Sequence, residues 1–108
     1  MYFHIPKERE PRELARGVRV RTFWGANLLL SVVEFDPHSE VTKHTHPHEQ
    51  GGIVLGGELE ISIAGESMLL RAGEVYIIPG QVEHWVRSGQ SPATLLDIFS
   101  PVREDLKY

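Results

Sequence analysis

Two histidines and a glutamine, His44, His46 and Gln50, are the residues of this sequence best suited to chemistry. All three have even numbers, and side chains two or four apart point to one face of an extended strand. Two imidazole nitrogens and an amide oxygen would form most of a transition-metal site. His84, in the segment IIPGQVEHW, can supply a further nitrogen. We therefore expect these four residues to hold one divalent ion, with nickel, manganese, iron, cobalt and zinc all open.

Other residues near this cluster are alternatives that the spacing leaves open. His48 shares the even parity, but it follows Pro47, which bends the local chain. Glu49 is chemically a better ligand than an amide, yet its parity directs it to the opposite face. Gln50 could also lie just outside a three-histidine site, and His84 could be an ordinary buried histidine. Surface or packing roles are expected for the two histidines outside this pattern, His4 and His38.

Length and composition limit what the chain can be. Its 108 residues, 41% of them hydrophobic, are enough for one domain with one core. Because there are no cysteines, a metal must bind nitrogen and oxygen, and a cytoplasmic location is expected. The first residues, MYFHIPKEREPREL, are too charged for a signal peptide, and no apolar run approaches the roughly 20 residues of a membrane span. The net charge of −4 makes nucleic acid an unexpected partner.

Strand-forming segments dominate the rest of the chain. β-Branched and aromatic residues are frequent in 18–24 and 27–35, and residues 58–63 alternate between apolar and polar. About eight short strands separated by turn signals predict an all-β sandwich or barrel. We expect a single domain over 1–108, with a core barrel at 18–99, an N-terminal arm at 1–17 and a C-terminal tail at 100–108. Within the arm, a short strand is expected at 2–5 and an exposed segment at 7–16.

Two spaced motifs resemble those of a known family. The spacing His44-x-His46-x3-Gln50-x6-Gly57 resembles the first cupin motif, and Gly73-x5-Pro79-x-Gln81-x2-His84 resembles the second. Glutamine stands at position 81, where the cupin motif usually has glycine. The resemblance implies the cupin double-stranded β-helix, a jelly-roll barrel, and a metal held by the histidines and glutamine already named.

An acidic residue, Asp97, lies in the middle of the apolar run TLLDIF near the end of the chain. A buried carboxylate without a partner is costly, so Asp97 should have a partner or a raised pKa. Arg103 is the candidate partner, in which case the pair could simply fix the tail to the barrel. This structural alternative and a functional role remain equally open from the pattern alone.

The ending LLDIFSPVREDL and the segment HPHEQ look like those of the small cupins of pectin and alginate degradation. That group converts 4,5-unsaturated uronates to linear keto-uronates. The resemblance implies that Asp97, Phe99 and Arg103 line a pocket beside the metal. Asp97 would shuttle a proton, Arg103 would clamp the substrate carboxylate, and Phe99 would form an apolar wall. Gly51-Gly52 replaces larger residues often found in the group, and we expect a wider pocket there.

The sequence therefore favours a metal-dependent enzyme that acts on a small anionic sugar. A non-catalytic metal-cupin that binds a small sugar or acid is the first alternative, and a cupin dioxygenase or decarboxylase is the second. Trp85 is odd-numbered beside inward-facing His84, so it should point out of the barrel together with Glu83 and Arg87. Because an outward tryptophan is usually covered, we expect a homodimer, with residues 2–5 of the same chain as the alternative cover.

Overall fold

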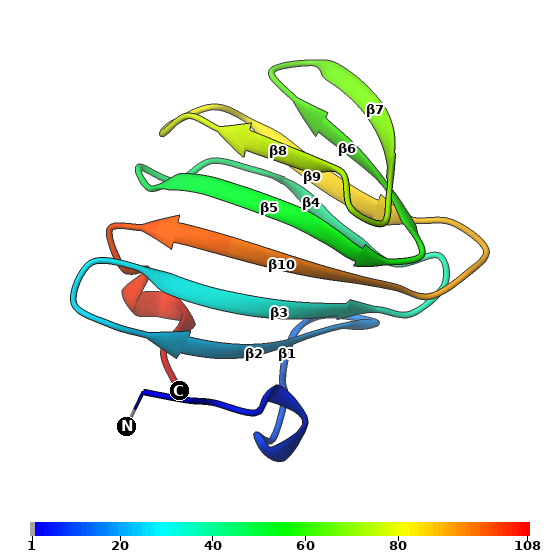
Figure 1. Ribbon diagram of the computed structural model, residues 1–108. Coiled ribbons are helices and arrows are strands. Elements are labelled where there is room, and N and C mark those ends of the chain that lie inside the picture. The colour runs from blue at the N-terminus through cyan, green and yellow to red at the C-terminus, as the bar shows by residue number, and fades with distance from the viewer. Residues whose placement is uncertain (1) are drawn as a thin grey trace.

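The computed structural model describes residues 2–108, and antiparallel strands in two sheets make up most of it (Figure 1). The six-stranded sheet has, in spatial order, β1 (Arg12–Ala15), β2 (Val18–Trp24), β3 (Leu29–Phe35), β10 (Ala93–Ser100), β5 (Glu49–Gly56) and β8 (Val75–Ile78). The four-stranded sheet has β4 (Glu40–His44), β9 (His84–Ser88), β6 (Glu58–Ile63) and β7 (Glu66–Arg71). This architecture confirms the all-β prediction.

The core lies between the inner faces of the two sheets. Alternation along the strands produces it, because every second residue of β2, β3 and β10 is buried. Both sheets contribute apolar side chains, among them Phe35, Val54, Leu59, Ile78 and Leu95. Phe35 is among the largest fully buried side chains, so its truncation to alanine should cost about 3–5 kcal/mol of stability.

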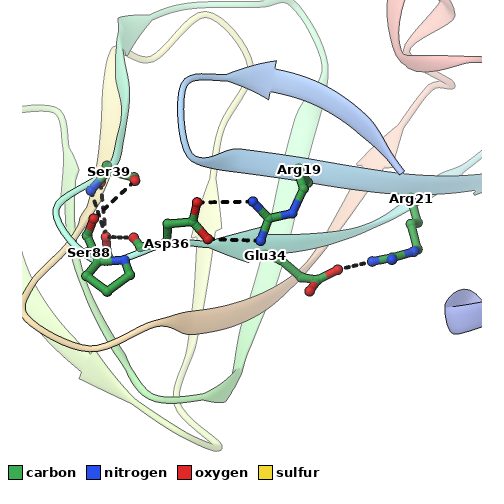
Figure 2. A network of polar contacts seen from close by, with 7 residues as sticks. Arg19, Arg21, Glu34, Asp36, Ser39 and Ser88 are labelled. Carbon is green, nitrogen blue, oxygen red and sulfur yellow. Dashed lines mark hydrogen bonds and ion pairs between the residues drawn. The ribbon is translucent and has the colours of Figure 1, made fainter. Parts of the chain in front are cut away.

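The turn that leads from the six-stranded sheet into the other one is fixed by hydrogen bonds (Figure 2). The Ser88 hydroxyl on β9 donates to the Asp36 carbonyl at 2.6 Å and accepts from the Ser39 backbone N–H at 2.9 Å. Beside this turn, the Arg19 guanidinium makes two hydrogen bonds to the Asp36 carboxylate. β4 therefore starts at a defined position opposite β9, and the two strands bring His44 and His84 together.

The two ends of the chain differ from expectation. Residues 2–5 form no strand: Tyr2 and Phe3 are exposed, and a 3-10 turn, η1 (Pro6–Glu8), follows. The segment at 7–16 is not simply an exposed arm, because β1 pairs with β2. Arg12 also donates to carbonyls of the C-terminal tail. The two ends of the chain accordingly lie together near β2 (Figure 1).

The tail is part of a second, smaller core. Val102 and Leu106 pack against Leu29 of β3 and Phe99 of β10, and a short 3-10 helix, η2 (Glu104–Leu106), contains the last of these contacts. The Thr22 hydroxyl donates to the Leu106 carbonyl at 2.7 Å. The tail thus holds Arg103 beside Phe99 of β10. None of the helices in residues 2–108 has the length and apolar character required to cross a membrane.

Candidate metal centre and adjoining cavity

Three of the predicted ligands meet between the sheets. His44 ends β4 and His84 starts β9, where the two residues are register partners. His46 lies in the loop that follows β4. One ring nitrogen from each histidine lies within 4.8 Å of the other two, so the three imidazoles could hold a metal ion. The predicted convergence of the histidines is confirmed.

Backbone carbonyls fix which nitrogen of each ring is free. In all three rings Nδ1 lies 2.8–3.0 Å from a carbonyl oxygen, and these belong to Thr42, His48 and Val82. A carbonyl only accepts, so the proton must be on Nδ1 and the lone pair on Nε2. The Nε2 atom of His84 is buried and, within residues 2–108, has no hydrogen-bond partner. An unpartnered buried nitrogen with an oriented ring fits a bound divalent cation.

Burial also favours the neutral form of two of these imidazoles, those of His46 and His84. Loss of solvent is the main cause that lowers the pKa of His84 to about 4, and it lowers the pKa of His46 as well. At neutral pH both rings are therefore unprotonated, as a metal ligand must be.

Gln50 adds an oxygen from the opposite sheet. It is buried on β5, and its Oε1 lies 2.9 Å from Nε2 of His46. Glu49 is exposed, so of these two neighbours Gln50 is the one that points inward, as expected. With the proton on Nδ1 of His46, both facing atoms are acceptors, an arrangement that a cation between them would stabilise.

The predicted ligands do not converge because they lie on one extended strand, as their parity suggested. The chain from His44 to Gln50 is not one strand: β4 ends at His44, β5 starts at Glu49, and the two strands belong to different sheets. The residues meet because the inner faces of the sheets face each other. His48 contributes its backbone carbonyl to the orientation of His46.

A tight turn at Gly80 and Gln81 packs against the loop that contains His46. A Cβ on Gly80 would meet the Pro47 carbonyl oxygen, and the Gln81 N–H donates to the His46 carbonyl at 2.8 Å. Gln81 has φ of 67°, in the left-handed region that glycine adopts most easily. The position where cupins usually have glycine therefore keeps the backbone shape in this chain although it has a side chain.

Asp97 does not pair with Arg103. Its Oδ1 accepts a hydrogen bond from the Tyr76 hydroxyl, and Tyr76 lies on β8. Burial is the main cause that raises the pKa of Asp97 to about 6, and hydrogen bonds from Tyr76 and Gln50 and the charge of Arg103 oppose it. The raised pKa was expected, but the predicted partner was wrong.

Arg103 is held by a different acid. Its Nε and one terminal nitrogen donate to the two oxygens of Asp105, at 3.2 and 2.7 Å. Its guanidinium lies 4.9 Å from the centre of the Phe99 ring. These two contacts orient the cation and leave its other terminal nitrogen free of the Asp105 carboxylate.

One cavity joins two of the predicted ligands to these residues. Its lining includes His44, Gln50, Asp97, Phe99 and Arg103, together with apolar side chains of both sheets, and its volume is about 40 Å³. The expected widening at Gly51-Gly52 is wrong. The space above Gly52 is filled, because a Cβ there would collide with the Tyr76 ring.

Tyr76 is the residue that sequence reasoning missed. It alternates with Ile78 on β8, and a tyrosine at an inward position needs a partner for its hydroxyl. The sequence could therefore have indicated that the Tyr76 hydroxyl needs a partner. It could not identify that partner, because Asp97 is on another strand and comes close only through the order of strands in the sheet.

A family model described as a cupin domain matches residues 31–99. This chain belongs to the cupin family. Pectin degradation protein KdgF from Dickeya dadantii (strain 3937) is 31% identical over 105 residues, which is 95% of this chain and 96% of that protein. The predicted family is therefore confirmed.

Solved structures agree over the whole chain. KdgF from Halomonas sp. has a TM-score of 0.92 at 27% identity and covers 99% of both chains. An RmlC-like cupin from Shewanella frigidimarina NCIMB 400 has a TM-score of 0.93 at 27% identity, covering 99% of this chain and 96% of the other. The structural likeness accordingly extends beyond the residues that the family model matches.

Proposed function

We propose that this cupin converts 4,5-unsaturated uronate monosaccharides to linear keto-uronates in the breakdown of uronic-acid polysaccharides. The observation that carries the proposal is the cavity that joins His44 and Gln50 to Asp97, Phe99 and Arg103. The similarity to a pectin degradation protein over 95% of the chain supports the same substrate class.

The ligands proposed for one divalent ion are His44, His46, His84 and, from the opposite sheet, Gln50. A bound ion supplies Lewis-acid polarisation of a substrate oxygen. All four donors are neutral, so they would leave the full positive charge of the ion in the site. Nickel, manganese, iron, cobalt and zinc all suit nitrogen and oxygen donors.

The residues around the cavity match the needs of the reaction. Opening the sugar ring breaks the bond between carbon 1 and the ring oxygen, and the resulting enol becomes a ketone when carbon 4 gains a proton. The proton that leaves the carbon 1 hydroxyl balances this gain, so no co-reactant is consumed. Asp97 is buried with a pKa of about 6, close to the working range of a general acid–base group. It would accept and return this proton through Oδ2.

Arg103 and Phe99 would position the sugar. The guanidinium of Arg103, oriented by Asp105, would bind the substrate carboxylate through its remaining N–H groups. Phe99 would lie against the apolar side of the ring. Phe99 is also close to the ligands, with its ring centre 5.6 Å from that of His46.

The narrow cavity is the observation that favours a second candidate. A cavity volume of about 40 Å³ has room for a few water molecules but not for a sugar ring, since one water needs roughly 10–15 Å³. A sugar ring must therefore bind at the mouth of the cavity or widen it. A metal-binding cupin that holds a smaller acid without turnover needs no such change.

Incubation of the metal-loaded protein with unsaturated galacturonate distinguishes the two candidates. The proposed enzyme should abolish the absorbance of the enol ether and release a linear keto-uronate, while Asp97→Asn should bind the sugar without consuming it. Binding without turnover by the wild type favours the second candidate. Oxygen consumption or release of carbon dioxide would instead favour a dioxygenase or decarboxylase.

The homodimer and the cytoplasmic location stay predictions. Trp85 is partly covered by its own chain, since the Arg87 guanidinium lies 3.9 Å from its ring centre. A stronger reason to expect a second copy is the outer face of the six-stranded sheet, where Val75, Ile77 and Ile98 are exposed.

A further inference from the structure

Three residues form a row across the inner face of the six-stranded sheet. Tyr76 on β8 is the register partner of Gly52 on β5, and Gly52 is the register partner of Asp97 on β10. The missing side chain of Gly52 leaves the space in which the Tyr76 ring lies. The ring crosses over β5, and its hydroxyl reaches the Oδ1 atom of Asp97.

The contact between Tyr76 and Asp97 does more than fill space in the core. A phenylalanine at position 76 would fill the same apolar space without placing a hydroxyl beside a carboxylate. Tyr76 and Asp97 are both buried, with 7% of each exposed, so the contact orders two polar groups in the interior. Asp97 lines the cavity, whereas Tyr76 is not among the lining residues. Tyr76 can therefore influence a ligand there only through lining residues that it contacts, and Asp97 accepts its hydrogen bond.

We propose that Tyr76 is a positioning residue that holds the Asp97 carboxylate in one orientation, and that glycine at position 52 makes this contact possible. The inference rests on the proposed function, in which Asp97 moves the proton. Because Oδ1 accepts the hydrogen bond of the tyrosine hydroxyl, Oδ2 would be the oxygen that moves the proton. A fixed carboxylate spends no time in orientations that cannot react, so the contact affects turnover rather than binding.

Tyr76→Phe tests the hydroxyl alone. We expect kcat to fall about 10–100-fold, the range typical for groups that orient a functional residue, and KM to stay within about twofold of wild type. Metal content and melting temperature should change little. A purely structural tyrosine would give a lower melting temperature and an unchanged kcat per folded molecule.

Two adjacent glycines provide a matched pair of variants. Gly52→Ala leaves the Tyr76 hydroxyl in the chain but pushes the ring away, because the new Cβ would overlap it. In Gly51→Ala the nearest contact of the new Cβ is the Tyr76 carbonyl oxygen at an ordinary 4.0 Å. We expect the kcat of Gly52→Ala to match that of Tyr76→Phe and the kcat of Gly51→Ala to match wild type. The Gly52→Ala/Tyr76→Phe double variant should lose less than the product of the two single losses.

The possible results separate this inference from the proposed function. An active wild type together with an equally active Tyr76→Phe overturns the inference and leaves the function standing. Equal activity of the two alanine variants overturns the role given to Gly52. A metal-loaded wild type that does not convert the uronate overturns both. If Gly52→Ala fails to fold, the kcat and KM of Tyr76→Phe decide alone.

Discussion

Replacing Asp97 with asparagine should raise the stability of this cupin at neutral pH while it abolishes turnover. Burial raises the pKa of Asp97 in the folded protein from 3.8 to about 6. Below pH 3.8 the carboxyl is protonated in both the folded and unfolded states. As the pH rises through about 6 the folded protein must hold a buried charge, so a raised acidic pKa means that stability is lost with increasing pH.

The size of this change in stability follows from the pKa shift of Asp97. About two pKa units correspond to about 3 kcal/mol of stability lost between pH 3.8 and pH values above 6. Asparagine cannot ionise, and its carbonyl can still accept from Tyr76, but its amide group brings a new buried donor that costs about 1 kcal/mol. The variant should therefore be about 2 kcal/mol more stable at pH 8 and about 1 kcal/mol less stable at the acidic limit.

Urea unfolding of metal-free wild type and Asp97→Asn from pH 4 to 8 measures this difference. Metal-free protein is needed because a nearby cation would lower the pKa of Asp97. Asp36→Asn is a control of opposite sign, because Arg19 lowers the pKa of the exposed Asp36 carboxyl and the variant should lose stability at neutral pH. A stability difference between wild type and Asp97→Asn that does not change with pH would refute the reasoning. So would an Asp97→Asn variant less stable than wild type at pH 8.

The remaining predictions concern the metal, the substrate, the backbone and assembly. His84→Ala should lose bound metal in elemental analysis while His48→Ala keeps it, and equal metal content in both would contradict the proposed ligand set. Arg103→Ala should raise KM at least tenfold with little loss of thermal stability, measured by steady-state kinetics and melting. Gln81→Gly should gain roughly 0.5–1 kcal/mol in urea unfolding, because it relieves a positive φ. Light scattering should give twice the mass of one chain, and Ile77→Asp should reduce it to one.

Much of the fold was predictable because local patterns carry it. The alternation in 58–63 appears as β6, and the segment at 18–24 appears as β2 with the same bounds. β4 was missed, because Glu40–His44 has an exposed, polar pattern and is a strand only through its pairing with β9. The order β3-β10-β5-β8, on which the site depends, is a property of long-range pairing that no local pattern contains.

The site was predictable in its residue types but not in its contacts. The parity of His44, His46 and Gln50 predicted that their side chains converge, and they do, but the reason was incorrect, since the chain changes sheets between them. The partner of Asp97 was misjudged because Arg103 is close in sequence, whereas Tyr76 is close only through sheet register. The burial of Asp97 and its raised pKa did follow from sequence, because any acid in an apolar strand faces the same cost.

The contacts of the other polar groups of the site indicate that Asp97 has a chemical rather than a structural role. The three histidine rings are oriented by backbone carbonyls, so they need no carboxylate for their orientation. Arg103 has Asp105 as its partner and does not need Asp97 either. Asp97 lines a cavity, pairs with no cationic side chain and lowers stability at neutral pH. A purely structural role does not explain these properties. The Tyr76 hydroxyl is then best explained by the same function, since a phenylalanine ring would also fill the gap at Gly52 and only the hydroxyl contacts Asp97.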